Sequence, residues 1–148
     1  MGTKKNNLVR TRRIYQGTTG VVVTPEGNVM YVPLNNLQER QAAVGGYIEA
    51  VPPATDLVTS ASLEIDPRSF ITYVDEDGRS KGLLPNRHAR RFYAEMFGLD
   101  EKHVELFGNT LYVDAAFERR DEEPNWNGVE PTKPFIKKIA ARLRAYVF

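Results

Sequence analysis

The sequence predicts an α+β domain, with a mainly antiparallel sheet, two short helices packed on it and a C-terminal amphipathic helix. Two runs of hairpin, helix and strand follow one another along the chain, which favours this class. Turn signals containing glycine join neighbouring β-branched segments. The 148 residues, 41% hydrophobic and 26% charged, fit a single globular domain.

The first run begins with strands over Val21 to Thr24 and Asn28 to Val32 around a Pro-Glu-Gly-Asn turn. An asparagine N-cap before Leu37 and the Gly45-Gly46 pair bound a helix from about residue 37 to 44. An apolar stripe is expected on this helix, formed by Leu37, Ala42 or Gln41, and Val44. Residues 47–51 follow as a strand that ends at two prolines.

The second run follows an ambiguous stretch, residues 54–66, which we interpret as a strand with loop character. Phe70 to Asp75 and Arg79 to Leu84 are predicted to pair as a second hairpin around Asp77-Gly78. Asn86 is then the N-cap of a helix. A turn or short helix over residues 100–107 leads to a strand over 110–117. The apolar face of the helix is expected to contain Ala89, Phe92, Tyr93, Met96 and Phe97.

Charge and composition predict four regions. These are a basic arm (1–16), the α+β core (17–117), a linker rich in proline and charge (118–134) and a basic amphipathic helix (135–148). The two ends carry five basic residues each and no acid, so the net charge of +1 conceals a middle of −9. The ends could attract an anionic polymer or fold back on the acidic body, and both interpretations stay open.

Several classes of protein are excluded. The absence of cysteine removes disulfides, thiolate zinc sites and thiol catalysis. No apolar run approaches the roughly 20 residues of a membrane span, and the basic N-terminus lacks a following apolar segment. We therefore expect neither secretion nor membrane insertion.

Three segments resemble one family when taken in order. They are LNNLQERQAAVGGYIEAVPP from Leu34, YVDEDGRSKGLLPNRHARRFY from Tyr73 and FGNTLYVDA from Phe107. Together they resemble the domain-of-unknown-function family numbered 3846, found mainly in bacteriophages, plasmids and other mobile elements, over about residues 21–116. The resemblance implies an accessory protein of a mobile element in the cytoplasm of a bacterial host. It implies no established activity.

Catalysis is the least supported function. His88 and His103 are the only histidines, and neither has the spacing of a metal site, so no metal or other cofactor is expected. We interpret His88 as a solvated residue whose protonated form is disfavoured by neighbouring arginines, and His103 as a residue of a surface turn. The acids at 75–77 are attributed to turn geometry, and Gly45-Gly46 ends a helix instead of opening a phosphate loop.

A small nucleotide-type ligand, such as a defence signal of the host, is one binding hypothesis. Arginines and aromatic rings near a helix N-terminus could hold phosphate and base. The alternative is that the asparagine only caps, the tyrosines only pack and the arginines pair with the acids at 75–77. The candidate ligand-binding residues are Tyr47, Glu49, Asn86, Arg87, Arg90 and Tyr93.

The other hypothesis is an interaction or assembly protein that binds a host protein, a second copy of itself or nucleic acid. Nucleic acid is less favoured because the body is acidic. The apolar face of the C-terminal helix, with Phe135, Ile139, Leu143 and Tyr146, could enter a partner's groove or close over its own sheet, with Trp126 under the linker. The candidate macromolecule-binding residues are Arg10, Arg12, Arg13, Lys137, Lys138, Arg142 and Arg144.

Overall fold

A computed structural model describes residues 18–34, 36–52, 65–115 and 134–148. The predicted basic arm, Trp126, the linker as far as residue 133 and most of the ambiguous stretch lie outside these ranges. The described strands form one antiparallel sheet in the order β2-β1-β5-β4-β3. They are β1 (Thr18–Val23), β2 (Val29–Leu34), β3 (Ile48–Val51), β4 (Phe70–Asp75) and β5 (Thr110–Asp114).

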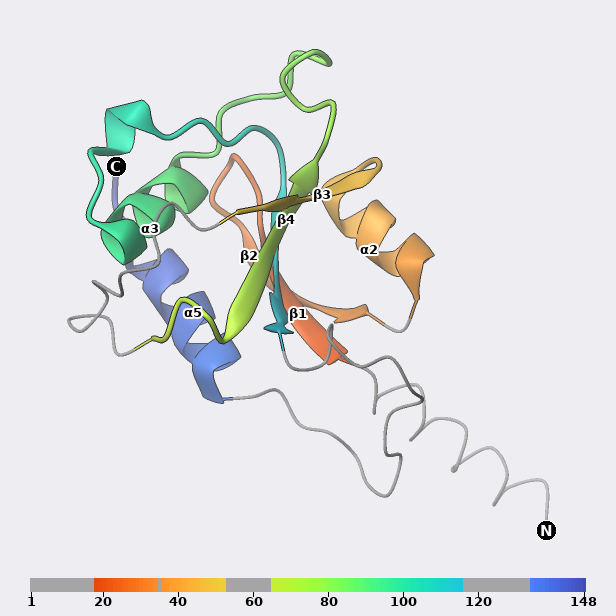
Figure 1. Cartoon of the computed structure of the whole chain (residues 1–148), viewed down its shortest axis with the longest axis horizontal. Helices are drawn as coiled ribbons and strands as arrows, with labels where there is room; N and C mark the ends of the chain where they lie inside the picture. Colours follow the sequence, from red (N-terminus) through yellow and green to blue (C-terminus); the bar gives the residue numbers. More distant parts are fainter. Residues whose placement is uncertain (1–17, 35, 53–64, 116–133) are drawn as a thin grey trace, which may run out of the picture.

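Helices cover both faces of this sheet, which confirms the α+β class (Figure 1). Helices α3 (Arg87–Phe97) and α5 (Pro134–Ala145) pack on one face, and α2 (Leu37–Val44) packs on the other. A short 3-10 helix, η2 (Glu101–His103), follows α3 and carries His103 on the surface, as predicted. No helix within the described ranges is long and apolar enough to cross a membrane.

Local signals place the first hairpin and the ends of α2 and α3 correctly. Strands β1 and β2 pair from Val23 opposite Val29 around the predicted turn. The Asn36 and Asn86 side chains accept hydrogen bonds from the backbone N–H three residues on, and Gly45 and Gly98 end the two helices in the left-handed conformation.

The predicted apolar stripe on α2 is wrong. Leu37 is 54% exposed, and Val44 is the only buried residue of this helix. The reason is that only the last turn reaches the sheet, where Val44 joins a small core with Leu34, Leu111 and Val113. Helix α2 is therefore attached to the sheet by one end.

The predicted return strand over residues 79–84 is also wrong. Strand β4 already has β3 on one edge and β5 on the other, so the sheet has no position for another strand beside it. Residues 76–82 form consecutive turns, in which Gly82 has a positive φ of 72°. The Lys81 ammonium donates to the Asp75 carboxylate at 2.7 Å and fixes the loop to the end of β4.

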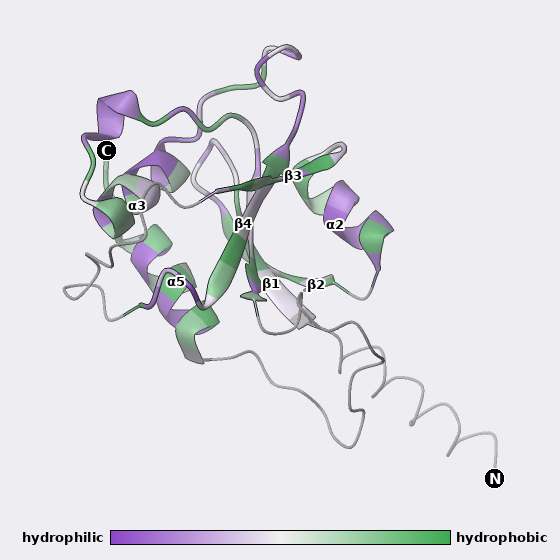
Figure 2. Ribbon diagram, in the orientation of Figure 1, coloured by the Kyte–Doolittle hydropathy of each residue, from purple (hydrophilic) through white to green (hydrophobic). Residues whose placement is uncertain are grey.

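The main core lies between the sheet and the helices α3 and α5. In Figure 2, α5 alternates between hydrophobic and hydrophilic residues, and its hydrophobic side chains enter this core. Ile136, Ile139 and Leu143 are completely buried there, beside Phe92 and Tyr112. The face of α5 therefore closes over its own sheet, which was one of the two predicted alternatives, and it is not free to enter a partner's groove.

Candidate functional site

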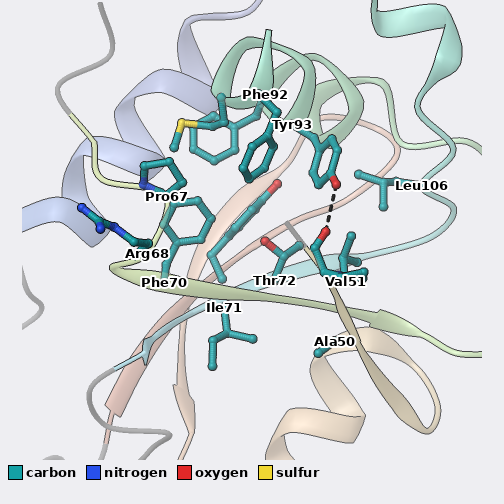
Figure 3. Close-up of a pocket in the computed structure, with 14 residues that line it drawn as sticks. Ala50, Val51, Pro67, Arg68, Phe70, Ile71, Thr72, Phe92, Tyr93 and Leu106 are labelled. Atoms are coloured by element: carbon teal, nitrogen blue, oxygen red, sulfur yellow. Dashed lines mark hydrogen bonds between the residues drawn. The ribbon is translucent and has the colours of Figure 1, made fainter. Parts of the chain in front are cut away.

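A largely apolar pocket opens between α3 and the β3–β4 edge of the sheet, with a volume of about 300 Å³ (Figure 3). Phe70 and Thr72 of β4 face Phe92 and Tyr93 of α3 across it. Ile71 points away from it, because successive side chains of a strand alternate between the two faces of the sheet. The pocket thus depends on one helix packing at the edge of a sheet.

Three aromatic rings form the deep wall of this pocket. The ring centroids of Phe70 and Phe92 lie 5.8 Å apart, those of Phe70 and Tyr112 lie 5.8 Å apart, and those of Phe92 and Tyr112 lie 5.4 Å apart. Such tilted and edge-to-face contacts favour a fixed arrangement of rings. The wall therefore presents a well-packed aromatic surface to the pocket.

Few polar groups reach the pocket. The Tyr93 hydroxyl donates to the Pro52 carbonyl at 2.9 Å, shown dashed in Figure 3. Burial raises the pKa of Tyr93, and burial also raises the pKa of Tyr112, so both phenols keep their protons at neutral pH. Arg68 lines the opening, where its Nε contacts the Asp66 carboxylate at 3.2 Å. Thr72 adds one hydroxyl to the lining.

Asn86 belongs to the interior and does not face a ligand. Its side chain is completely buried, and its Oδ1 accepts from the Ala89 N–H at 3.0 Å. Its Nδ2 donates to the carbonyls of Val23 and Gly108, at 2.9 Å each. The prediction that Asn86 caps α3 is confirmed, and its proposed contact with phosphate is not supported because the amide is already bonded.

The arginines of α3 are held by η2. The Glu101 carboxylate accepts from Arg87 Nε at 3.4 Å and from Arg91 Nε at 3.0 Å, while its carbonyl accepts from Arg90 at 3.2 Å. Burial acts against ionisation of Glu101, but the bonds from Arg91 and Arg87 hold its pKa below the usual range. The alternative that these arginines pair with the acids at 75–77 is wrong, because all three bond to Glu101 instead.

The other candidates for ligand binding are spread over the surface. Tyr47, which directly precedes β3, is 67% exposed, and Glu49 is exposed on that strand. Of the six predicted residues, Tyr93 alone lines the apolar pocket. The structure therefore does not bring the predicted nucleotide-binding set together.

The predicted basic surface of α5 is partly neutralised. Arg142 donates to Glu95 at 2.7 Å, and Arg144 donates to the Val29 carbonyl at 3.1 Å. Lys137 and Lys138 are exposed. The remaining candidates, Arg10, Arg12 and Arg13, lie outside the described residues.

His88 is not the solvated residue that the sequence predicted. Its ring contacts Phe148 edge to face, with 4.8 Å between centroids, and its buried Nδ1 has no hydrogen-bond partner among the described residues. Its pKa is lowered, as predicted, but burial is the cause and not the neighbouring arginines. Within the described ranges, no group of three or more His, Cys, Asp or Glu residues is placed to hold a metal ion.

Sequence reasoning missed most of the pocket. Phe70, Thr72 and Val51 were placed correctly in strands, and Phe92 and Met96 on the apolar face of α3. No local pattern predicts that this face leaves a pocket against the edge of the sheet. The alternation of Phe70 and Thr72 on one face of β4 was the available signal. Comparison with protein-family models, curated proteins and solved structures found no match, so the resemblance described above remains a prediction.

Proposed function

We propose that this chain is a binding protein whose pocket between α3 and the sheet edge takes a flat apolar ring. The supporting observation is the preformed aromatic wall of Phe70, Phe92 and Tyr112 in a concave and mainly apolar site. Ligand sites are commonly of this kind, with a few polar groups that orient the ligand. Thr72 and Arg68 are the groups placed to do so.

The size of the pocket favours a small ligand. An apolar cavity of roughly 150 Å³ accommodates benzene. A pocket of about 300 Å³ therefore suits a ligand of about two rings. This chemistry differs from the phosphate-centred ligand expected from the sequence, because the cations proposed for phosphate are bonded to Glu101.

Binding is proposed instead of catalysis on the basis of the lining groups. Among the described lining residues, the ionisable side chains are Arg68 and the phenols of Tyr93 and Tyr112. A phenol with a raised pKa does not accept a proton at neutral pH, so these groups do not supply a general base. The role in a mobile element and the host-derived nature of the ligand stay predictions from the resemblance.

Titration with 2-naphthol tests this proposal. We expect heteronuclear NMR to show saturable shifts at Thr72, Tyr93 and Phe70, which line the pocket. Val51→Trp should fill the pocket and weaken binding by about tenfold or more, which corresponds to roughly 1.4 kcal/mol.

Leu37→Trp is the matched control, since it adds the same ring at an exposed position on the opposite face of the sheet. This variant should bind 2-naphthol like the unmodified chain. Equal affinity for the Val51→Trp and unmodified chains, or shifts confined to α2, would overturn the proposal.

A further inference from the structure

We propose that the natural ligand is an extended peptide that adds to the outer edge of β3 as a further antiparallel strand and places an aromatic side chain in the pocket. This inference rests on the proposed function, because it names what carries the ring. The observation behind it is that β3 has outward backbone groups with which no described strand pairs, at the rim of the pocket, where Ala50 contributes to the lining.

The direction of the β3 backbone groups follows from one hydrogen bond. Glu76 N–H donates to the Tyr47 carbonyl at 2.9 Å, so residues 47 and 76 form a hydrogen-bonded pair of the antiparallel ladder. Such pairs recur at every second residue, which directs the backbone of Glu49 and Val51 toward β4. The N–H and C=O groups of Ile48 and Ala50 therefore point away from the sheet, and no described strand pairs with them.

Pro52 supports this assignment. By the same alternation its carbonyl points outward, and it accepts the hydrogen bond from the Tyr93 hydroxyl of α3. Among the described residues, a pocket residue thus bonds to Pro52, just after β3, while the outward backbone groups two residues earlier, at Ala50, have no strand beside them. A strand added there would lie roughly 4.8 Å from β3. Its side chain opposite Val51 would be on the face of the sheet that carries the pocket.

The opposite edge of the sheet, at β2, is more hindered, although the backbone groups of Tyr31 also point outward there. The outward groups of β2 belong to Val29, Tyr31 and Pro33, because Thr24 N–H donates to Asn28 O and the pairs alternate from there. The Val29 carbonyl accepts from Arg144, and Pro33 has no N–H. A charged side chain at an edge and a proline in an edge strand both hinder pairing with another strand. Strand addition is therefore favoured at β3 over β2.

The charge of Glu49 indicates a second feature of the peptide. Glu49 is exposed on β3 and shares the face of Val51, two residues away. In an antiparallel strand whose aromatic residue lies opposite Val51, the second residue after it lies opposite Glu49. A basic residue there would pair with the Glu49 carboxylate across the strands. The expected ligand thus contains the pattern aromatic-any-basic.

Calorimetry with the acetylated and amidated peptide TTFTKTT tests the inference, together with displacement of 2-naphthol. We expect the peptide to bind and to displace 2-naphthol. N-methylation of the central threonine, which lies opposite Ala50, should weaken binding by about tenfold or more, because it removes a hydrogen bond to the Ala50 carbonyl. N-methylation of the phenylalanine is the control. Its N–H would point away from β3, so affinity should change by less than about threefold.

A charge exchange tests the register. The Glu49→Lys variant should bind TTFTKTT more weakly and TTFTETT more tightly than the unmodified chain does. Binding of 2-naphthol without displacement by the peptide, or equal effects of the two N-methyl groups, would overturn the inference and leave the proposed function standing. Failure of both 2-naphthol and the peptide to bind would overturn both.

Discussion

A single buried amide, Asn86, holds together parts of the chain that are distant in sequence. It caps α3, and its amide nitrogen bonds the last residue of β1 and the glycine before β5. Loss of this side chain would leave two buried carbonyls without these bonds, which costs more than loss of a cap alone. Its position in the sequence before a helix indicated only the cap.

Asn86→Ala should therefore lower the free energy of unfolding by about 2–4 kcal/mol, the sum of a lost cap and unpaired buried carbonyls. Urea denaturation measures this change. Asn36→Ala is the matched control, because Asn36 caps α2 in the same way at an exposed site, and it should cost about 1 kcal/mol. Equal costs for the two variants would contradict the linking role of Asn86.

The second residue with a measurable consequence is His88, whose burial lowers its pKa. The unfolded chain then takes up a proton at His88 more readily than the folded chain does. The free energy of unfolding therefore has its full value above the unfolded pKa of 6.5 and decreases as the pH falls below it. We expect the urea midpoint to fall between about pH 6.5 and 5, and His88→Gln to remove most of this dependence.

His103→Gln provides the control for His88, since His103 is exposed on η2 and its replacement should leave the dependence unchanged. Carboxylates with lowered pKa values, such as Asp75, whose bond from Lys81 lowers its pKa from 3.8, titrate below this window. A pH dependence that persists in His88→Gln and disappears in His103→Gln would contradict the assignment.

At the scale of elements, the sequence predicted what local signals determine. The caps and glycine ends of α2 and α3 lie within a few residues of the helices that they bound, and the first hairpin has its turn residues in place. The return strand over 79–84 failed because pairing depends on which strands occupy the edges of β4. Strands β3 and β5 occupy them, and both are distant in sequence.

The candidate site was less predictable than the fold for the same reason. The sequence grouped arginines and tyrosines near Asn86 by proximity along the chain, whereas Glu101 on η2 binds those arginines and leaves Tyr93 facing β3. The pocket needs several separate segments to meet, and side-chain volumes across that junction decide whether it stays open. The periodicity of apolar residues within one segment does not predict whether side chains from several segments leave a pocket between them.

At the scale of the whole molecule, α5 is part of the main core. Its residues Ile136, Ile139, Ala140 and Leu143 are completely buried with residues of β1, α3 and β5. The basic residues of this helix lie on the other side, where Arg142 pairs with Glu95 of α3. Removing the helix would expose the main core, so a truncation there reports on folding before it reports on any partner.

Leu143→Ala should destabilise the chain by about 2–5 kcal/mol, the usual cost of removing a buried leucine side chain. Thermal unfolding followed by circular dichroism measures the change. Val147→Ala is the control, because Val147 lies two residues after the end of α5 and is 86% exposed. Its truncation should change stability by less than about 0.5 kcal/mol. Comparable losses in both variants would contradict a core role for α5.

The difference between the two edges of the sheet limits how many copies of the chain can join through their strands. A molecule with two open edges can be joined to another on each side, and repetition of that contact gives a filament without end. In the described part of this chain, Arg144 and Pro33 restrict pairing at β2 on either side of Tyr31. Contact between copies through β3 would therefore join two molecules and would not repeat through β2 into a filament.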